Sequence, residues 1–253
     1  MPLKAYSLTE KPELEPDFDR LADLGWPRFL RQRDELGSGK LWPSLFTTWA
    51  EYQTALYDDA GRVAAVAHAV PIAWDGTPAG LPDSIAAILE TAQHDRTTGR
   101  APTALAALAA IVDPAWRQQG LSRRLLEQLR FMAERRGLDA LIAPVRPTSK
   151  ARYPLTPLER YVAWTTDGGE PFDPWLRVHA RLGAEILRVA PRTLAISGTI
   201  AQWEEWTDMA FPESGLYVVP GALQPVAIDR ERDEGRYEDP NVWMRRALKG
   251  ARA

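Results

Sequence analysis

The sequence predicts a protein of the α/β class (α+β), in which helices cover a β-sheet. Residues 105–112 form an unbroken run of small apolar side chains, which is typical of a strand buried on both faces. Residues 52–57 alternate weakly in polarity, and a turn signal after them leads into a long returning strand at 62–74, which indicates a β-hairpin. Helical patterns follow the returning strand and the run at 105–112.

The composition restricts the class of protein. Of the 253 residues, 45% are hydrophobic and 26% are charged, and the net charge is -3. This balance is typical of a soluble globular chain and argues against nucleic acid as a partner. No apolar run approaches the length of a transmembrane helix and the N-terminus lacks an apolar signal region, so we expect a cytoplasmic protein without membrane contact.

Cysteine and histidine usage restricts the chemistry. The chain has no cysteine, which excludes disulfides, thiolate metal sites and a cysteine nucleophile. Its three histidines, His68, His94 and His179, lie far apart in the sequence. We therefore expect no metal site.

The N-terminal part has few regular signals. Residues 1–16 are expected to be extended, and Asp17 is a plausible N-cap for a helix that starts at Phe18. Pro27 should kink or divide this helix. His68 lies inside the returning strand, where a structural role is the simpler interpretation and contact with substrate is the alternative. An aromatic cluster follows the loop at 37–39 and belongs either to the core or to a substrate cleft: Trp42, Phe46 and Trp49.

The middle of the chain alternates helix and strand. A helix is predicted at 84–93, and the polar sequence His94-Asp95-Arg96 after it should be a solvated loop. The helix at 121–137 carries an apolar face at helical spacing and ends at a glycine. A strand follows at 138–145. Residues 146–169 are either an insertion beside the substrate site or a surface connection.

The C-terminal part begins with a clear helix signal, in which Asp173 is the N-cap and Pro174 the first helical residue. We then expect a strand at 184–197, a helix at 200–209 whose tryptophans pack inward, and a last strand at 224–229. Residues 229–239 hold six acids and three arginines. We interpret them as a solvated charged tail.

The segment after the central strand has the features of an anion site. The first N–H groups of a helix lack intrahelical partners and carry partial positive charge, so phosphate binds there. Gly120 stands just before the predicted helix and would let the backbone approach a pyrophosphate closely. Between Arg117 and Arg136 there are six arginines and two acids, which suits a polyanionic ligand.

At these residues the chain resembles the GNAT superfamily of acyl-CoA-dependent N-acyltransferases. The family signature, Q/R-x-x-G-x-G/A, lies between a central strand and a helix. Here it reads Arg117-x-x-Gly120-x-Ser122, with Val112-Asp113-Pro114 upstream. Ser122 departs from the final glycine or alanine but is also small.

The resemblance implies a GNAT-like fold, with a central mixed, mostly antiparallel twisted sheet flanked by helices and with N- and C-terminal extensions. The resemblance covers roughly 52–197, and together with the chain length it predicts one domain over 1–253, divided into a helical segment at 1–51, a core at 52–197 and an extension at 198–253. In the family, two neighbouring strands splay apart to admit the pantetheine arm of CoA. The co-substrate would be acetyl-CoA or another acyl-CoA, without a metal. The residues implied to hold it are Ala110, Ile111, Val112, Arg117, Gln118, Gln119, Gly120, Leu121, Ser122 and Arg123.

The implied general acid differs from the family pattern. Members often carry a tyrosine four residues before a helix-ending glycine, and this tyrosine protonates the departing CoA thiolate. Here His179 occupies that position before Gly183, so it is our candidate general acid, with a structural histidine as the alternative. Its neighbours Arg177 and Arg181 would disfavour the protonated imidazole.

Two further positions bear on catalysis. Many members carry a carboxylate base on the central strand, whereas the one candidate here is Asp113, at the end of that strand. The last strands of the family often complete the acceptor wall, so Tyr217 is a second candidate catalytic residue.

The leading hypothesis is direct transfer of an acyl group, in the first place acetyl, from CoA to the amine of a small-molecule or peptide acceptor. The missing strand carboxylate motivates an alternative, a CoA-binding regulatory or partner module with reduced catalysis. A different phosphate-binding enzyme is a third hypothesis, which the lack of GxxxxGK[ST] and GxGxxG motifs disfavours. The segments PWLRVHARLG and SGLYVVPGAL resemble GNAT-type domains found beside carbon–nitrogen hydrolase domains. The sequence leaves room for a homodimer.

Overall fold

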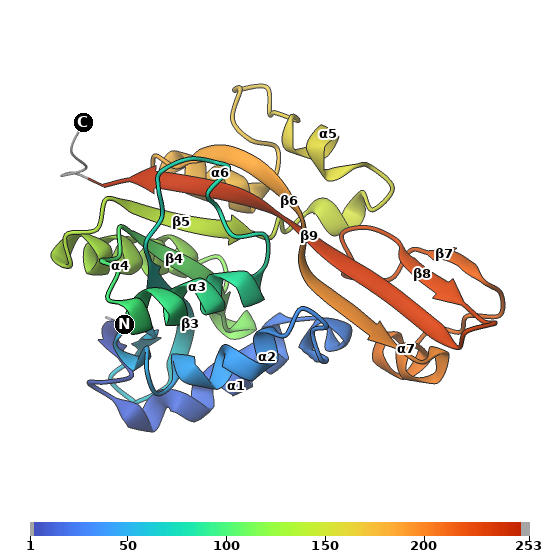
Figure 1. The fold of residues 1–253 in the computed structure, drawn as a ribbon, viewed down its shortest axis with the longest axis horizontal. Helices are drawn as coiled ribbons and strands as arrows, with labels where there is room; N and C mark the ends of the chain where they lie inside the picture. Colours follow the sequence, from blue (N-terminus) through green and yellow to red (C-terminus); the bar gives the residue numbers. More distant parts are fainter. Residues whose placement is uncertain (1–2, 249–253) are drawn as a thin grey trace.

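The computed structural model describes residues 3–248 and contains a nine-stranded sheet flanked by helices (Figure 1). The strand order is β1-β2-β3-β4-β5-β9-β8-β7, and β6 pairs with β9 off this path. Every pair is antiparallel except β4–β5, so the sheet is mixed and mostly antiparallel, as predicted. The strands are β1 (Lys4–Ser7), β2 (Thr54–Tyr57), β3 (Val63–Ile72), β4 (Ala104–Val112), β5 (Ala140–Val145), β6 (Glu185–Gly198), β7 (Gly215–Tyr217), β8 (Val226–Asp229) and β9 (Glu234–Ala247).

The helices lie between these strands in the chain. The α-helices are α1 (Glu15–Gly25), α2 (Ser38–Leu41), α3 (Ile85–Thr98), α4 (Leu121–Arg135), α5 (Leu158–Val162), α6 (Pro174–Arg181) and α7 (Ile200–Thr207). The 3₁₀ turns are η1 (Pro12–Leu14), η2 (Arg28–Arg31), η3 (Trp42–Leu45), η4 (Ala50–Tyr52), η5 (Pro114–Trp116) and η6 (Lys150–Arg152).

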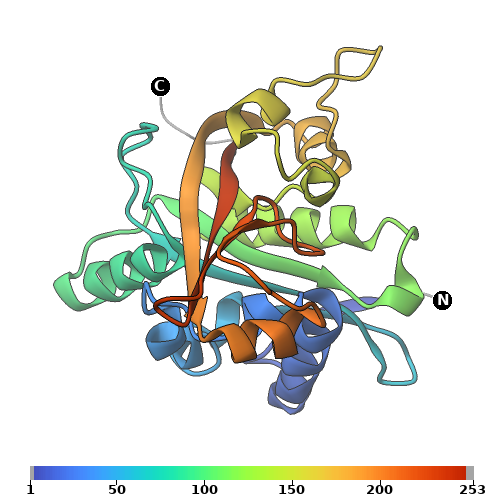
Figure 2. The same ribbon diagram turned by 90° about the vertical axis from the view of Figure 1, so that its right-hand side faces the viewer.

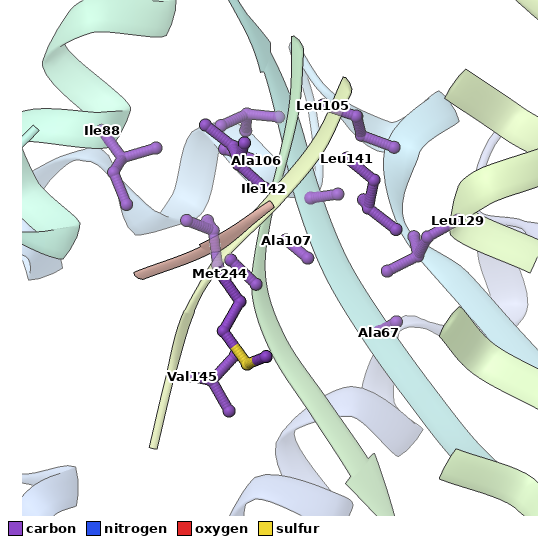
Figure 3. Packing of buried hydrophobic residues seen from close by; sticks show 14 of the residues in the cluster. Ala67, Ile88, Leu105, Ala106, Ala107, Leu129, Leu141, Ile142, Val145 and Met244 are labelled. Atoms are coloured by element: carbon purple, nitrogen blue, oxygen red, sulfur yellow. The ribbon is translucent and has the colours of Figure 1, made fainter. Parts of the chain in front are cut away.

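The main core lies on both faces of β3, β4 and β5 (Figure 3). Leu105 and Leu141 lie on the side of Leu129 in α4, whereas Ala106 and Ile142 lie on the other side of the sheet. Because successive side chains of a strand point to opposite faces, β4 is buried on both, as its apolar run predicted.

The strands β4 and β5 are joined over a short distance only. Their parallel pairing ends with Ala106 and Ile142, after three residue pairs. Beyond this point β4 continues along β3 and β5 continues along β9, so the two strands diverge. A β-bulge in β4 lies at the same place, because Ala107 and Ala109 face consecutive residues of β3 and Leu108 is left between them. The divergence is the splay that the family resemblance implied.

The charged segment at 229–239 is part of the sheet, and the prediction of a solvated tail is wrong. Residues from Glu234 onward form β9, which pairs with β5, β6 and β8. Tyr237 and Asp239 point inward while Arg236 and Glu238 are exposed, so the charges follow the period of two of a strand. The extension predicted at 198–253 therefore supplies a strand of the main sheet, and the strand at 224–229 is not the last.

Two other boundaries also need correction. The helix α1 begins at Glu15, so Asp17 lies in its first turn and does not cap it. The helix α3 continues to Thr98, through the residues predicted as a solvated loop. Asp95 is buried in that turn, where its Oδ2 accepts a hydrogen bond from the Ala73 N–H at 2.7 Å.

A second hydrophobic cluster lies away from the splay, between β8, β9, α7 and η2. The long strands β6 and β9 connect it to the rest of the sheet (Figure 1). Trp203 is fully buried in this cluster and its ring lies 5.4 Å from that of Trp206, which confirms that these tryptophans pack. The cluster comprises Phe29, Ile196, Ile200, Trp203, Phe211, Val219, Ala222, Val226, Ile228 and Tyr237.

Candidate active site

A large cleft opens where β4 and β5 diverge. Its volume is about 1330 Å³, and its walls come from the ends of β4 and β5, the start of α4, the helix α6 and the N-terminal segment around α1 and α2. Ligand pockets are commonly about 300–1000 Å³. The cleft therefore has room for two substrates side by side.

The start of α4 is shaped for an anion. Gln118 and Gly120 adopt positive φ of 63° and 73°, so the loop turns sharply before the helix. Within residues 3–248, no side chain caps the first N–H groups of α4, and a Cβ built on Gly120 would meet nothing within 4 Å. The loop thus presents unpaired donors to open space.

The structure brings most of the predicted loop residues to the cleft. Its lining from this loop consists of Arg117, Gln118, Gly120, Leu121 and Ser122. Gln119 and Arg123 are exposed and do not line the cleft. They lie at the outer rim of the loop.

The end of β4 supplies the next part of the wall. The three predicted residues Ala110, Ile111 and Val112 all line the cleft. The edge of β4 that faces β5 has no partner strand here. Since strand residues alternate in the direction of their N–H and C=O groups, several backbone groups on this edge are available to a ligand.

Asp113 is not free to act as a base. Its Oδ2 accepts a hydrogen bond from Arg20 at 2.9 Å and its Oδ1 accepts one from the Ala115 N–H at 2.9 Å. Burial alone would raise the pKa of this carboxyl, but the bonds from Arg20 and Ala115 hold it below its ordinary value. The side chain thus anchors the turn after β4 to α1.

His179 lies on α6 and faces the cleft. Its ring is buried and packs edge-on against Trp175 at 4.5 Å. Neither ring nitrogen has a hydrogen-bond partner among residues 3–248. Burial lowers the pKa of the imidazole to about 4, so the side chain is neutral at physiological pH.

The sequence predicted that Arg177 and Arg181 would keep the imidazole of His179 neutral, but both arginines are bound elsewhere. The guanidinium of Arg177 is bound to the carbonyls of Pro171 and Phe172, and that of Arg181 pairs with Glu170 at 2.6 Å. Desolvation, and not repulsion by these arginines, lowers the pKa of His179.

Tyr217 does not reach the cleft. It lies on β7 in the second cluster, with its ring 4.9 Å from that of Phe211. Its hydroxyl donates to the carbonyl of Glu213 at 2.9 Å. The strand β7 stands at the far end of the long hairpin (Figure 1), so the structure separates Tyr217 from the other predicted site residues.

The segment 146–169 is partly a cleft wall, since Arg146, Thr148 and Ala151 line the cleft. Ala151 belongs to η6, which the buried Lys150 anchors by donating to the carbonyls of Tyr153 and Leu223. The pKa of this lysine is lowered by burial. The segment therefore contributes to the site through three residues.

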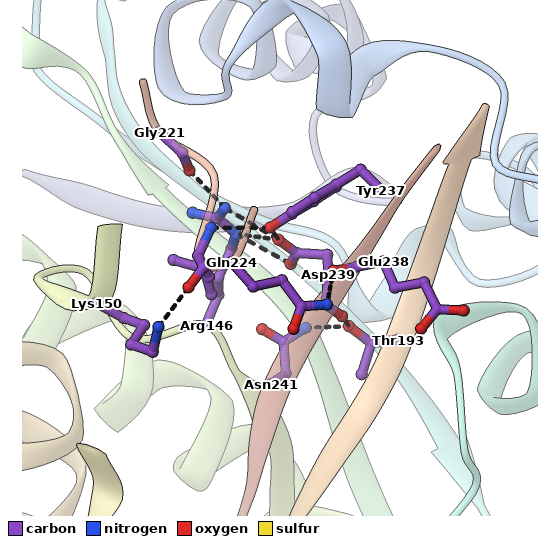
Figure 4. Close-up of polar contacts among 10 residues, drawn as sticks. Arg146, Lys150, Thr193, Gly221, Gln224, Tyr237, Glu238, Asp239 and Asn241 are labelled. Atoms are coloured by element: carbon purple, nitrogen blue, oxygen red, sulfur yellow. Dashed lines mark hydrogen bonds and ion pairs between the residues drawn. The ribbon is translucent and has the colours of Figure 1, made fainter. Parts of the chain in front are cut away.

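A polar network forms the end of the cleft beyond β5 (Figure 4). Arg146 donates to both carboxylate oxygens of Asp239 at 3.0 Å, and the Tyr237 hydroxyl donates to the same carboxylate at 2.6 Å. Asn241 also lines the cleft, and its buried Oδ1 has no partner among the described residues. Arg146 compensates the buried charge of Asp239.

Among residues 3–248 no group of three or more histidine or acidic side chains could hold a metal ion. None of the helices in that range is long and apolar enough to cross a lipid bilayer.

No family model matches the chain. The loading GNATL domain of CurA from Lyngbya majuscula has the same fold, with a TM-score of 0.61 and 15% identity over 98% of both chains. The GphF GNAT-like decarboxylase in complex with isobutyryl-CoA gives a TM-score of 0.57 and 21% identity over 98% of this chain and 100% of that one.

A curated relative is closer in sequence. The chain is 34% identical over 247 residues to the arginine N-acetyltransferase avaD of Aspergillus versicolor, and the match covers 87% of this chain and 84% of that protein. The chain belongs to the GNAT superfamily of N-acyltransferases. The GNAT fold thus accounts for the splayed strands and for the cleft between them.

Two cleft residues of this GNAT chain were not singled out from the sequence as site residues. Asp34, between η2 and α2, is buried and accepts hydrogen bonds from the N–H groups of Leu36, Ser38 and Ala195. No lysine or arginine pairs with it among the described residues. His68 was favoured as structural, yet it also lines the cleft. No local pattern marked either residue, because each reaches the cleft through contacts between distant segments.

Proposed function

We propose that the protein transfers the acetyl group of acetyl-CoA to a nitrogen of arginine or of a small arginine-containing molecule. The observation that carries the proposal is the 34% identity, over 87% of the chain, to an arginine N-acetyltransferase. The cleft of about 1330 Å³ supports it, because both co-substrates must be held together for direct transfer.

Acyl-CoA fits the α4 end of the cleft. The uncapped N–H groups of α4 and the open space beside Gly120 suit its pyrophosphate. The free edge of β4 at Ala110, Ile111 and Val112 suits the pantetheine amides, and Arg117 adds positive charge. We assign the loop 117–123 to CoA, with Gln119 and Arg123 at its rim. A fold neighbour in complex with isobutyryl-CoA supports this co-substrate.

A cationic acceptor fits the opposite wall. Asp34 brings a buried negative charge to the cleft and has no cationic partner among the described residues. Such a charge is costly unless a positive group pairs with it, and a guanidinium would do so. Arg33 and Lys40 line the same wall, which suits an acceptor that also carries a carboxylate.

The reaction needs a proton donor for the sulfur. The acceptor nitrogen attacks the thioester carbon, a C–N bond forms, the C–S bond breaks and CoA leaves as a thiolate. His179 is neutral and has no hydrogen-bond partner for its ring within the described part of the chain, so one ring N–H is available to the sulfur and the other ring nitrogen to an incoming proton. We therefore assign it the role of proton donor as a neutral imidazole. Tyr217, which lies outside the cleft, is given no role.

The test is an acetyl-transfer assay. The protein is incubated with acetyl-CoA and with arginine, agmatine or an arginine-containing dipeptide, and free CoA thiol and the acetylated product are measured. We expect turnover with at least one of these acceptors. His179→Ala should lower kcat about 100-fold or more with little change in CoA affinity, while His94→Ala, at an exposed position on α3, should behave as the wild type. Binding of acetyl-CoA without transfer to any of the acceptors would refute the proposal.

That negative outcome would favour the second candidate, a CoA-binding module with reduced catalysis. The observation behind it is that Asp113, the one carboxylate at the end of β4, is bound to Arg20. Transfer by the wild type would exclude it. The cytoplasmic location, the homodimer and the neighbouring hydrolase domain stay predictions from the sequence.

A further inference from the structure

His68 stands in an aromatic box at the splay. It is 2% exposed on β3, and its ring lies 5.0 Å from the rings of Phe18 and Trp42 and 5.7 Å from that of Phe46. In the sheet it faces Ala109 of β4, next to the bulge at which β4 leaves β5.

The tautomer of this imidazole is fixed by Gln53. The Gln53 amide nitrogen donates to two carbonyls, those of Trp49 at 2.8 Å and Ala69 at 2.9 Å. The amide oxygen must then be the atom 3.0 Å from His68 Nδ1. Because this oxygen can only accept, Nδ1 must carry the proton and Nε2 must hold a bare lone pair.

The lone pair on Nε2 has no donor of its own. Among residues 3–248, Gln53 is the one hydrogen-bond partner of His68, and the side chain is one of those that line the cleft. Buried acceptors normally have a partner. A buried acceptor left bare at a cleft wall is therefore suited to an N–H or O–H group of a ligand.

The two cleft histidines approach from opposite faces of the sheet. His68 is covered by the N-terminal helices through Phe18 and Trp42, whereas His179 lies beside Leu126 of α4. Figure 2 shows the N-terminal helices (blue) on one side of the strands and α4 (green) on the other. One neutral imidazole, His179, is thus placed for the departing thiolate, and the other, His68, for the attacking nitrogen.

The geometry points to His68 Nε2 as the group that accepts a hydrogen bond from the attacking nitrogen and receives its proton. As the C–N bond forms, one proton passes from this nitrogen to Nε2 while the C–S bond breaks. The thiolate gains a proton from the His179 side, and solvent restores both imidazoles, so the products are an N-acetyl compound and CoA thiol. The inference rests on the proposed function and adds the acceptor-side group to it.

The surroundings of His68 support this role. Burial lowers the pKa of its imidazole to about 3, so Nε2 remains unprotonated at every pH at which an amine is a nucleophile. A base this weak receives the proton only as the C–N bond forms and the nitrogen becomes strongly acidic, and it returns the proton readily to solvent. A neutral ring also does not repel a cationic acceptor as it enters.

The first experiment compares His68→Met with His94→Met, the same change at an exposed position of α3. For His68→Met we expect kcat/KM for the acceptor to fall about 100-fold or more, while the Kd of acetyl-CoA measured by calorimetry stays within about twofold. His94→Met should match the wild type. In His68→Gly, added imidazole should restore part of the lost rate. A purely structural role would lower CoA affinity and melting temperature in parallel and would give no rescue.

The second readout is independent of turnover. Long-range ¹H–¹⁵N NMR of the wild type should show His68 as the Nδ1–H tautomer, and the Nε2 resonance should shift when acceptor is added to the CoA-bound protein. Full activity of a folded His68→Met, or an Nε2–H tautomer, would overturn the role of His68. Absence of acetyl transfer by the wild type would instead refute the proposed function. The wild type is therefore assayed before any variant.

Discussion

Mild acid should destabilise this protein through its two cleft histidines. The ordinary pKa of a histidine is about 6.5, and burial lowers it to about 3 for His68 and to about 4 for His179. Because the folded-state pKa lies below the unfolded one, protonation favours the unfolded chain. The stability that these groups contribute is complete well above pH 6.5 and is lost as the pH falls below it.

The size of the effect follows from the linkage relation. Between pH 7.5 and pH 5.0 each unfolded histidine binds nearly one proton that the folded protein does not bind, which corresponds to about 2 kcal/mol per group. Both together amount to about 4 kcal/mol. A domain of this kind has a free energy of unfolding of about 5–15 kcal/mol, so the loss is a large fraction of the total.

Urea denaturation at the two pH values measures this difference. In His179→Leu the loss of stability between pH 7.5 and pH 5.0 should shrink by about 2 kcal/mol, whatever the variant does to stability at pH 7.5. The exposed His94→Leu should leave the loss unchanged. If the wild type loses less than about 1 kcal/mol, or if His179→Leu keeps the full loss, then the cleft histidines are not buried in their neutral form.

Three further outcomes are expected. Gly120→Trp should weaken acetyl-CoA binding about 100-fold or more in calorimetry, because an indole would fill the open space beside the α4 start; unchanged affinity would move the cofactor elsewhere. Arg146→Met should lower the free energy of unfolding by about 3–5 kcal/mol, since it leaves the Asp239 carboxylate buried and unpaired, and the double variant with Asp239→Leu should recover most of this loss. Asp34→Asn should reduce the preference for arginine over neutral citrulline in kcat/KM about tenfold, and an unaltered preference would mean that the acceptor's cation binds elsewhere.

The sequence was informative where the deciding signal is local. The N-cap Asp173 and the apolar run of β4 each act within a few residues, and both elements form where predicted. The glycine before α4 likewise marks the turn by its own backbone freedom.

The predictions failed where residues far away in the chain determine the structure or the environment of a segment. The segment from Glu234 looks like a solvated tail until Arg146, far away in the chain, pairs with Asp239 and β5 and β6 provide hydrogen-bonding edges. His179 is neutral because elements distant in the sequence pack over it and bury it. The arginines beside it in the sequence give no information on this burial. The separation of Tyr217 from the cleft depends on the length and direction of the β8–β9 hairpin.

The three residue pairs that join β4 to β5 also indicate where the width of the cleft is set. So few ladder bonds fix only one end of the opening, and the other end is held from outside, by β3 on one side and by β9 on the other. A substitution on β9 that shifts its register along β5 would therefore change the size of acceptor that enters, without altering any residue that touches it. Homologous chains could in this way diverge in substrate range through a strand that carries neither of the two cleft histidines.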